Sequence, residues 1–471
     1  HYLGAVPVLL GNEMAQTPDD MTRTHFTLIN AYTHPALAAS LFKAEDRLKL
    51  EENWSGTFLV GHINGGVARV GKTKAMDTIE SGPVFGTYAA AYFAERYRLR
   101  DLLCFDVGGT TTKLSVVRDA SPVVEADGNL FDIPVKTPLQ LLRSLALGGG
   151  SVAKVGANGL QLGPESMGAA PGPACYGLGG GETTLTDCLL ILGYLDATEF
   201  LDGDRQLDSV AAEKSVSTNI AIPLGIDIPA AAERVVELAC TVLREFLDTT
   251  SKTAGTRTNA APLFAYGGNG PLLAALTAER LGITSVYVSF ALGPVFSAFG
   301  TAISKVMHIY EHGVVPDATS KLPDSVASII EKQKQRAALD LEAEGFSGDD
   351  ATFTSELEPS EGDTVVLDDG QPLPELDNVT GVVVRLRAAY PVPTYEPSLP
   401  LCEPADSRNG ERSVYLRGEE IKVMTHDVTR LQPEQTILGP ALISGGSTTC
   451  FVPPQWRLTV DKFGNGILQG T

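Results

Sequence analysis

The stretch "LLCFDVGGTTTKLSVV", residues 102–117, decides the predicted fold. Its apolar start ends at Asp106, a Gly-Gly pair and three threonines follow, and "KLSVV" then alternates between polar and apolar residues. Alternation with β-branched side chains is typical of a strand rather than of a helix. We therefore predict a hairpin of two strands, 102–107 and 113–117, joined by a glycine-rich turn.

The turn of this hairpin has the composition of a phosphate-binding loop. Gly108 and Gly109 lack a Cβ atom, so backbone N–H groups can approach an anion closely. The hydroxyl groups of Thr110, Thr111 and Thr112 add hydrogen-bond donors. Asp106 can hold the water shell of a magnesium ion, which keeps several waters when bound. The residues alone leave an ordinary Gly-Gly hairpin turn open as the alternative.

Two other phosphate-binding loops do not fit this stretch. A dinucleotide fingerprint or a P-loop runs from its strand into a helix. Here a second strand follows, and the stretch contains no Gly-Lys-Ser or Gly-Lys-Thr. The order strand, loop, strand resembles instead the hairpin with which the actin, sugar kinase and Hsp70 superfamily holds phosphates.

The composition predicts a soluble globular protein of two or three domains. The chain has 471 residues, of which 43% are hydrophobic and 20% are charged. The formal net charge of −21 argues against nucleic acid and anionic membranes as partners, because both attract positive surfaces. No apolar run approaches the length of a membrane span.

The cysteines point to a cytoplasmic protein. Six are scattered along the chain, mostly in apolar settings and without a C-x-x-C pair, which indicates buried free thiols in a reducing cytoplasm. The chain begins with His1 and shows no signal peptide, so we expect its start to be trimmed.

A second glycine-rich loop lies in "PLFAYGGNGPLLAALTAERLGI", residues 262–283. An apolar strand ends at Gly267 and a helix opens with Pro271, and a glycine loop before a helix N-terminus is a ready-made anion site. Because open α/β sheets bind ligands at the carboxyl ends of their strands, we expect this loop and "DVGGTTTK" to face the same cleft.

The rest of the chain predicts helices first and strands later. Apolar periodicity predicts helices over 19–50, with an interruption at Pro35, and over 228–252. Beyond about residue 320, one polar helix leads into short strands separated by turns. We read this last part as a β-rich C-terminal domain.

Several separated segments match one family, in the same order along the chain. The chain resembles the hydantoinase A / 5-oxoprolinase family. The combination of "PGPACYG", "TLTD" and "GGNGP" is more specific than any single glycine motif. The resembling segments run nearly from end to end: "LINAYTHPAL", "HINGGV", "ESGPVFG", "CFDVGGTTTKLS", "GPESMGAAPGPACYG", "TLTDCLLILGYL", "FAYGGNGPLLAALTAERLGI" and "LGPALISGGSTTCFVPPQWRLTVDKFGNGIL".

The resemblance implies an α/β fold of the actin-like ATPase type, in which two RNase H-like halves close on ATP. It implies that residues 1–98 are the remainder of the first half, that residues 99–310 are the second half, and that residues 311–471 are a β-rich C-terminal domain. The first phosphate loop, normally an Asp-Gly-Gly-Thr hairpin, is not found in the sequence. We therefore expect the N-terminal part of the first half to be missing.

The resemblance also assigns the candidate site. It implies that Asp106 to Lys113 form the second phosphate loop, with Mg²⁺ held by Asp106 through water, and that Gly267 to Pro271 form the adenosine loop. Asp187, in "TLTD", either complements a helix dipole or polarises water or substrate. The expected catalytic residues are Asp106, Lys113 and Asp187, and the expected ATP-binding residues are Gly108, Gly109, Thr110, Thr111, Gly267, Gly268, Asn269 and Gly270.

Two features depart from the family pattern. Lys113 stands where many relatives have Asp, and a lysine there can contact a phosphate instead of supporting metal or water. The Arg-Tyr-x-Gly-Gln element that often precedes the C-terminal β region is not found around residues 351–368. Among other candidates, Cys175 reads as a structural thiol, and His308 and His312 do not form a helical zinc motif.

The resemblance implies a subunit of an ATP-dependent carboxylase of the acetone or acetophenone type, which activates a ketone, bicarbonate or both by phosphorylation. An ATP-dependent hydrolase of a cyclic amide, such as 5-oxoproline or a hydantoin, is one alternative, and a non-catalytic structural subunit is another. The expected cofactors are ATP and Mg²⁺ without biotin, because "KAMD" at 74–77 does not place a lysine between methionines. The expected protein partner is a hydantoinase B-like large subunit in a hetero-oligomer.

Overall fold

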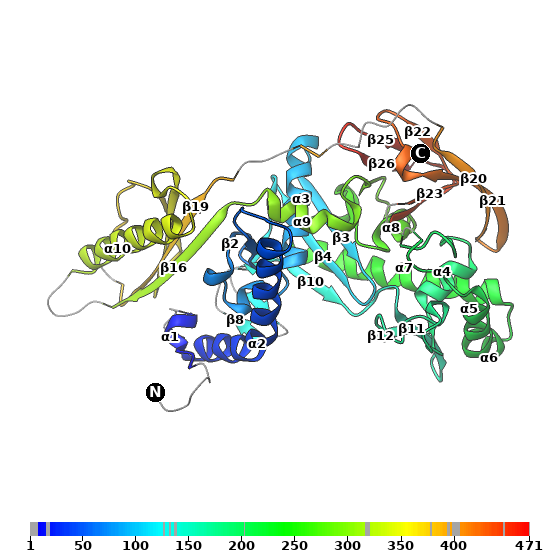
Figure 1. The fold of residues 1–471 in the computed structure, drawn as a ribbon, viewed down its shortest axis with the longest axis horizontal. Helices are drawn as coiled ribbons and strands as arrows, with labels where there is room; N and C mark the ends of the chain where they lie inside the picture. Colours follow the sequence, from blue (N-terminus) through cyan, green and yellow to red (C-terminus); the bar gives the residue numbers. More distant parts are fainter. Residues whose placement is uncertain are drawn as a thin grey trace. The chain divides into compact units, whose positions relative to one another are not determined.

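The computed structural model describes residues 8–15, 19–125, 128–130, 133–135, 139–201, 203–315, 321–376, 379–392, 396–397, 406–445 and 448–470 (Figure 1). The chain divides into two compact units, each assembled from separate segments. Unit 1 consists of His1–Phe85, Val124–Gln140 and Thr301–Thr394, and unit 2 of Gly86–Val123, Leu141–Gly300 and Tyr395–Thr471.

A mixed sheet of nine strands forms the centre of unit 2 (Figure 1). The strands β3 (Asp101–Val107) and β4 (Thr112–Arg118) pair antiparallel, which confirms the hairpin predicted from the sequence. β14 (Leu263–Tyr266) pairs in parallel with β3 on one side and with β15 (Ser285–Ser289) on the other. The remaining strands are β5 (Ser121–Pro122), β10 (Leu142–Leu145), β22 (Thr436–Leu438), β25 (Trp456–Val460) and β26 (Asn465–Gly470).

Helices pack on this sheet. α8 (Gly270–Glu279) contacts β14 and β15, and α7 (Ile228–Thr253) contacts α8. α7 begins where the Asp227 side chain accepts a hydrogen bond from the Ala230 N–H (2.8 Å), an arrangement that satisfies one of the unpaired donors of a first turn. The other helices with most of their residues in unit 2 are α3 (Ser81–Tyr97), α4 (Leu185–Ile191), α5 (Ser209–Val216), α6 (Ile222–Leu224) and α9 (Phe296–Ala302).

Two smaller sheets complete unit 2. One has three strands in the order β12–β11–β13, and the other has four in the order β20–β21–β23–β24. α8 also packs on β24, so the C-terminal strands share the core of the nine-stranded sheet. The strands are β11 (Ser151–Gly156), β12 (Gly159–Ser166), β13 (Thr183–Thr184), β20 (Arg408–Leu416), β21 (Glu419–Asp427), β23 (Ala441–Gly445) and β24 (Thr448–Val452).

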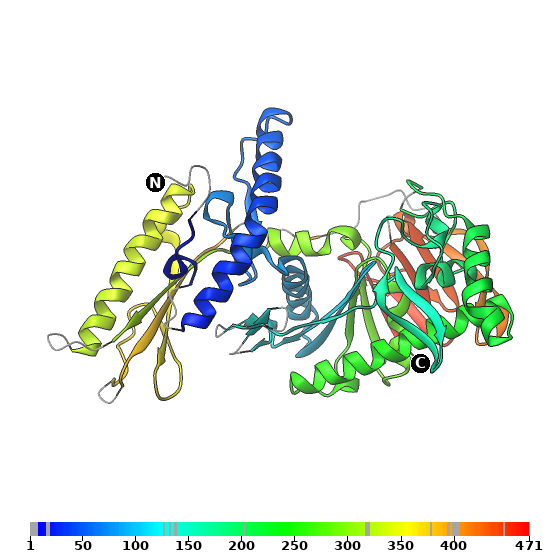
Figure 2. The same ribbon diagram turned by 90° about the horizontal axis from the view of Figure 1, so that it is seen from below.

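A six-stranded sheet forms unit 1, in the order β1–β2–β16–β19–β17–β18. α10 (Leu322–Ala343) lies along β16 and β19 (Figure 2). The strands are β1 (Leu59–Gly61), β2 (Val67–Arg69), β16 (Val306–Val314), β17 (Thr352–Pro359), β18 (Val365–Asp368) and β19 (Val382–Tyr390), with two short pairs, β6 (Val124–Glu125) with β9 (Leu139–Gln140) and β7 (Gly128–Leu130) with β8 (Ile133–Val135).

The long N-terminal helix of unit 1 corrects one expectation. α1 (Gly11–Met14) precedes α2 (Asp20–Leu50), which runs without a break through Pro35, so the predicted interruption is wrong. A proline removes a single N–H donor from the helix ladder, while the bonds of the turns before and after it remain. Pro35 is exposed, so its ring displaces no packed neighbour.

The β-rich character of the C-terminal region is confirmed, and its strands are shared between the units. β17 to β19 belong to the sheet of unit 1, whereas β20 to β26 belong to unit 2. The division of the sequence into 1–98, 99–310 and 311–471 stays a prediction, since spatial units and sequence domains are different properties.

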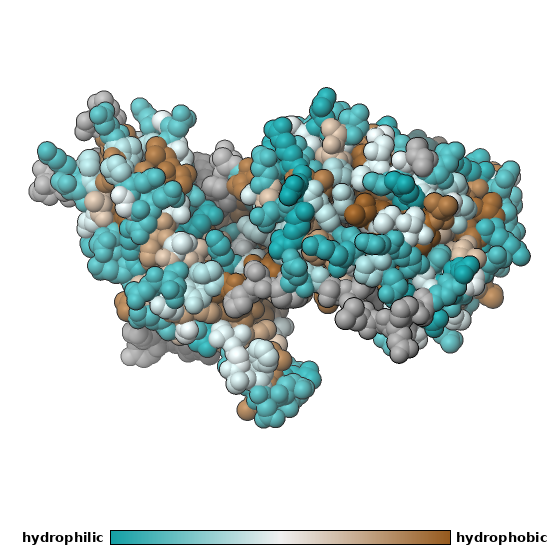
Figure 3. Space-filling model, turned by 90° about the horizontal axis from the view of Figure 1, so that it is seen from above, coloured by the Kyte–Doolittle hydropathy of each residue, from teal (hydrophilic) through white to brown (hydrophobic). Residues whose placement is uncertain are grey.

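On the face seen in Figure 3, hydrophilic residues surround smaller hydrophobic patches. Among the described residues, no helix combines the length and apolarity that crossing a membrane requires.

An aromatic cluster around Phe93 of α3 fills the core of unit 2. Phe93 is fully buried, and its ring stacks on those of Phe264 (centroids 5.5 Å apart) and Phe296 (6.2 Å). Phe463, on the C-terminal segment, meets it edge to face at 5.8 Å. Aromatic rings bury large apolar areas, so this cluster ties α3, β14, α9 and the C-terminal segment together.

We expect Phe93→Ala to lower the free energy of unfolding by about 3–5 kcal/mol, because the lost ring leaves a cavity that its stacked neighbours cannot fill. Denaturant unfolding followed by circular dichroism measures this loss. Val210→Ala, at a side chain that is 75% exposed on α5, is the control and should change stability by less than about 0.5 kcal/mol. Equal effects of the two substitutions would contradict the assignment of Phe93 to the core.

Candidate functional site

The turn between β3 and β4 presents a row of backbone N–H groups. It closes with a hydrogen bond from the Gly108 N–H to the Thr111 carbonyl (3.0 Å). Gly109 and Thr110 are exposed. Within the part of the chain that the structure describes, the N–H groups of Gly109, Thr110 and Thr111 donate to no protein acceptor. Successive N–H groups of this kind form a concavity that suits an anion.

The loop "LGGGS", residues 147–151, lies directly against this turn. The Gly149 N–H donates to the Gly108 carbonyl (3.1 Å), and the Gly150 N–H donates to the Gly109 carbonyl (2.6 Å). The Thr112 hydroxyl donates to the Leu147 carbonyl (2.7 Å) in a buried bond. No role for this loop follows from the motifs of the sequence. Its run of three glycines is the signal that marks it, because only glycine permits such close backbone contact.

The "GGNG" loop is the third element of the cluster. The Asn269 N–H donates to the Val107 carbonyl (2.9 Å), and Asn269 Nδ2 donates to the Gly108 carbonyl (3.1 Å). The two loops therefore lie together, as a shared cleft requires, although 161 residues separate Gly108 and Asn269; that both face one cleft stays a prediction. Gly270, the first residue of α8, is buried beneath the loop, whereas Gly268 is exposed.

Asp106, the last residue but one of β3, lies half-buried beside Gly267. Burial raises the pKa of its carboxyl group to about 6, and the positive charge of Lys113 opposes this rise only in part. Among the described residues, no donor forms a hydrogen bond or ion pair with this carboxylate. A partly desolvated carboxylate without an internal partner is costly, and such groups mark sites that bind or react.

Lys113 stands opposite Asp106 in the β3–β4 register, so the two side chains share one face of the hairpin. Its ammonium group donates a hydrogen bond to the Ser144 hydroxyl on β10 (2.7 Å). The predicted phosphate-loop residues of the hairpin and the "GGNG" loop are thus brought together in one cluster: Asp106, Gly108, Gly109, Thr110, Thr111, Lys113, Gly267, Gly268, Asn269 and Gly270.

Asp187 is fully buried and occupied by protein donors. It caps α4 in a capping box with Thr184, whose N–H and hydroxyl both donate to its carboxylate (2.9 and 2.8 Å). It also accepts hydrogen bonds from the N–H groups of Ala174 (3.2 Å) and Cys175 (2.8 Å). Of the two roles left open for Asp187, these contacts favour the structural one, and a catalytic role stays a prediction.

Cys175 has the surroundings of a structural thiol. It is fully buried, and burial together with the nearby Asp187 charge raises the pKa of its thiol far above neutral pH. Cysteine reacts as the thiolate, so this environment argues against a nucleophile.

His308 lies on β16 and pairs with Glu344 (2.7 Å). Among the described side chains, no three or more His, Cys, Asp or Glu residues are grouped to hold a metal ion.

The stretch "GVARVGKT", residues 66–73, has the spacing of a P-loop, but the structure excludes that role. Residues Val67–Arg69 form strand β2 and pair with β1, where a P-loop would place free N–H groups. Lys72 donates to Asp340 (2.6 Å), and the Thr73 hydroxyl lies 3.0 Å from His62 Nε2. Both residues that would hold phosphate and metal are therefore engaged within unit 1.

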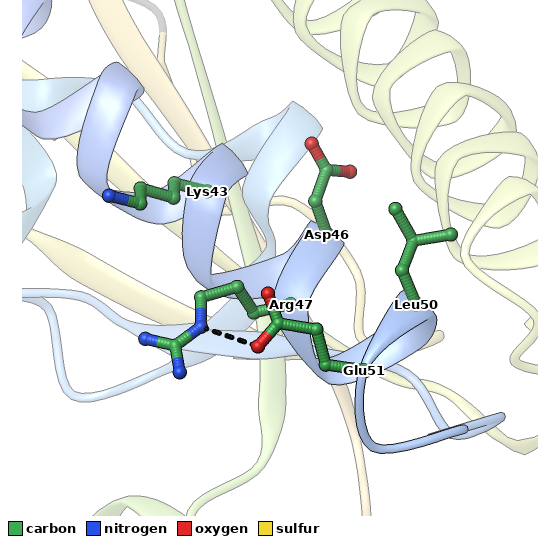
Figure 4. A pocket seen from close by; sticks show the side chains of 5 residues that line it. All are labelled: Lys43, Asp46, Arg47, Leu50 and Glu51. Atoms are coloured by element: carbon green, nitrogen blue, oxygen red, sulfur yellow. Dashed lines mark hydrogen bonds and ion pairs between the residues drawn. The ribbon is translucent and has the colours of Figure 1, made fainter.

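A pocket at the end of α2 is also unrelated to the loop cluster. Figure 4 shows its lining, which comes from the last turns of that helix and the residue after it, and Arg47 pairs there with Glu51 (3.1 Å). The lining residues are Lys43, Asp46, Arg47, Leu50 and Glu51. None of the sequence-predicted site residues lines it.

Family models identify the class of protein that this fold and loop cluster define. A model described as hydantoinase/oxoprolinase matches residues 23–310, and one described as hydantoinase/oxoprolinase C-terminal domain matches residues 364–465. The chain therefore belongs to the hydantoinase/oxoprolinase family. This result confirms the family and the fold class that the sequence motifs predict.

Individual relatives agree with this assignment. The gamma subunit of acetophenone carboxylase from Aromatoleum aromaticum is 29% identical over 520 residues, which cover 100% of this chain and 70% of that protein. A nucleotide-free structure of acetone carboxylase, described for ATP-dependent acetone carboxylation, has a TM-score of 0.86 at 23% identity over 99% of this chain and 71% of its own. The ATP-dependent caprolactamase from Pseudomonas jessenii has a TM-score of 0.75 at 24% identity, covering 98% and 72%. At these identities the two structures establish the fold alone.

Two neighbouring glycines provide a matched test of the loop packing. A Cβ atom on Gly267 would lie 2.3 Å from Asp106 Oδ1 and 2.8 Å from the Val107 carbonyl oxygen, and its φ of +76° is strained for other residues. We expect Gly267→Ala to cost on the order of 2 kcal/mol or more in unfolding free energy. Gly268→Ala meets no atom within 4 Å and should be nearly neutral. Thermal unfolding of the two variants checks this, and equal melting temperatures would contradict the geometry.

The raised pKa of Asp106 predicts a stability effect with a definite sign. Between about pH 4 and pH 6 the native carboxyl binds protons more tightly than the unfolded one, so stability falls as pH rises through this window. At pH 7.5 the charged carboxylate should cost the ligand-free fold up to about 3 kcal/mol. Asp106→Asn should therefore stabilise the protein at pH 7.5 and have little effect at pH 4.

Urea titrations at the two pH values measure this difference. Asp119→Asn is the control, because that side chain is 73% exposed just beyond the far end of β4. A destabilising effect of Asp106→Asn at pH 7.5 would show that the carboxylate supports the fold.

Proposed function

We propose that this chain is a subunit of an ATP-dependent, biotin-independent carboxylase of the acetophenone or acetone carboxylase type. Its task would be to activate a ketone, bicarbonate or both by phosphorylation. One observation carries the proposal: in one cluster of loops, a row of N–H groups lies near the Asp106 carboxylate, and among the described residues neither the N–H groups nor the carboxylate has a hydrogen-bond partner. Phosphoryl transfer depends on positioning and charge neutralisation more than on covalent chemistry by the protein. The N–H groups would supply the positioning, and Lys113 together with a metal ion held by Asp106 would supply the charge neutralisation.

The loop residues take distinct roles in this proposal. The N–H groups of Gly109, Thr110 and Thr111, with the threonine hydroxyls, hold the terminal phosphates of ATP. Lys113 adds positive charge beside them. The Gly267–Gly270 loop borders the rest of the nucleotide. We assign Asp187 a supporting part, because its carboxylate is already occupied by four protein donors.

Asp106 fits a water-mediated magnesium site. Mg²⁺ keeps several of its waters and is bound through one or two carboxylates together with substrate phosphates. A carboxylate that accepts no hydrogen bond from the described residues offers the oxygen ligand that such an ion requires. When bound, the ion neutralises charge on the transferring phosphate. Asp106 then holds its water shell at the carboxyl end of β3.

The substrate class rests on the relatives. The acetophenone carboxylase subunit aligns with the whole of this chain, which favours a ketone as the molecule to be carboxylated. The relatives' names describe subunits, which supports a hetero-oligomer, and we propose a hydantoinase B-like large subunit as the partner. The alternative is ATP-dependent opening of a cyclic amide, which the caprolactamase likeness favours. Both activities use the same phosphate site.

The direct test removes the Asp106 carboxylate from the enzyme assembled with its partner subunit. We expect Asp106→Asn to reduce ATP consumption by at least about a hundredfold, because the developing phosphate charge loses its metal. Assembly, followed by size-exclusion chromatography, should be unchanged. The measurement is nucleotide product formed per minute, with Asp119→Asn as the control.

Two outcomes would contradict the assignment. Full activity of Asp106→Asn would make this chain a scaffold and place the ATP chemistry in another subunit. Loss of assembly would make the carboxylate structural. Products from a panel of acetophenone, acetone, 5-oxoproline and hydantoin, each with ATP and bicarbonate, would then separate the carboxylase from the amide hydrolase.

A further inference from the structure

The carbonyl groups of the hairpin turn determine where its N–H groups point. In a planar trans peptide, a carbonyl and the N–H of the next residue point in opposite directions. The Gly108 carbonyl therefore sets the direction of the Gly109 N–H, and the Gly109 carbonyl sets that of the Thr110 N–H. The groups that hold these two carbonyls therefore determine the direction of the Gly109 and Thr110 N–H groups.

Three donors hold the two carbonyls, and all come from outside the hairpin. The Gly108 carbonyl accepts from the Gly149 N–H and from Asn269 Nδ2, both at 3.1 Å. The Gly109 carbonyl accepts from the Gly150 N–H at 2.6 Å. The donors approach the carbonyl side of the turn, so the opposite side keeps its N–H groups available.

The 147–151 loop is itself held by hydrogen bonds from α4. The Thr186 N–H and hydroxyl both donate to the Gly149 carbonyl at 2.8 Å. Thr186 lies in the first turn of α4, which begins with the capping box of Thr184 and Asp187. Hydrogen bonds thus link the first turn of α4 to Gly149, and Gly149 to the Gly108 carbonyl.

No side chain can enter this contact. A Cβ atom on Gly148 would lie 2.7 Å from the Gly108 carbonyl oxygen and from the Thr110 nitrogen, and one on Gly149 would lie 2.7 Å from Asn269 Nδ2. Real Cβ atoms do not approach so closely. The three glycines thus bring one backbone against another, and they are all buried.

We propose that the 147–151 loop and the Asn269 side chain are positioning elements that aim the Gly109 and Thr110 N–H groups at a phosphate. Asn269 would then act on the phosphates through the Gly108 carbonyl, rather than on the nucleoside that its place in an adenosine loop implies. This inference rests on the proposed function, and it assigns a role to residues 147–151 in the same site.

The test measures binding of three probes to the assembled enzyme by calorimetry: MgADP, inorganic tripolyphosphate with Mg²⁺, and adenosine. We expect Asn269→Ala to weaken MgADP and tripolyphosphate about tenfold, as the loss of one orienting hydrogen bond predicts, and to leave adenosine unchanged. Asn269→Asp, of the same shape, turns an acceptor toward the Gly108 carbonyl and should weaken both phosphate probes further.

Asn219→Ala is the matched control, since that amide donates to the Gly181 carbonyl (3.0 Å) outside the loop cluster. It should change none of the three affinities. Thermal unfolding of each variant accompanies the titrations, so that a general loss of structure is recognised.

Each other result overturns the inference. Loss of adenosine affinity with unchanged tripolyphosphate affinity would place Asn269 on the nucleoside. Unchanged affinity for all three probes, or an equal loss of all three with a lower melting temperature, would leave Asn269 without a positioning role. A wild-type enzyme that binds neither MgADP nor tripolyphosphate would refute the proposed function itself, before any variant is compared.

Discussion

The parallel pairing of β14 with β3 is the constraint on which the candidate site depends. Its register runs from Leu263 opposite Leu103 to Tyr266 opposite Asp106, so both strands end at the same level of the sheet. Carboxyl ends of neighbouring parallel strands share one edge, and glycine follows each of these two. Because the interior residues of both strands are buried, a shift of register would expose apolar side chains. Core packing therefore places the loops that follow β3 and β14 next to each other.

At this edge, the close backbone contacts and the Asp106 carboxylate are expected to have opposite effects on stability. Glycines at 148, 149 and 267 let the loops approach within distances that no Cβ atom allows, and many hydrogen bonds hold the turn rigid. Among the described residues, none donates a hydrogen bond to Asp106 in the same cluster, and burial raises the pKa of its carboxyl group, so we predict that the ionised form costs stability. Rigid positioning of donors and acceptors before a ligand arrives is the arrangement that stabilises developing charge most effectively. The predicted stability cost is consistent with a site selected for binding.

The sequence predicts those parts of the site that depend on local pattern. The β3–β4 hairpin and the strand, loop and helix around Asn269 follow from periodicity and glycine placement, and their proximity follows from the sheet rule. The 147–151 loop could not be assigned in the same way: its run of three glycines indicates a close backbone contact, but the sequence does not show which distant segment the loop meets. Asp187 is a related case: a helix-capping acid and a catalytic acid look alike in sequence, and the four donors around Asp187 favour the capping role. The P-loop spacing at 66–73 occurs on a paired strand, and Pro35 sits inside an unbroken helix, so tertiary context decides both cases.

The measurement that tests the central claim most directly is a structure of the assembled enzyme with a non-hydrolysable ATP analogue and Mg²⁺. The account predicts the terminal phosphates on the N–H groups of Gly109, Thr110 and Thr111, with the metal ion linked through water to Asp106. It also predicts that Gly149 and Asn269 keep their hydrogen bonds to the Gly108 carbonyl in the bound state. A nucleotide bound away from this turn, or present only on another subunit, would contradict it.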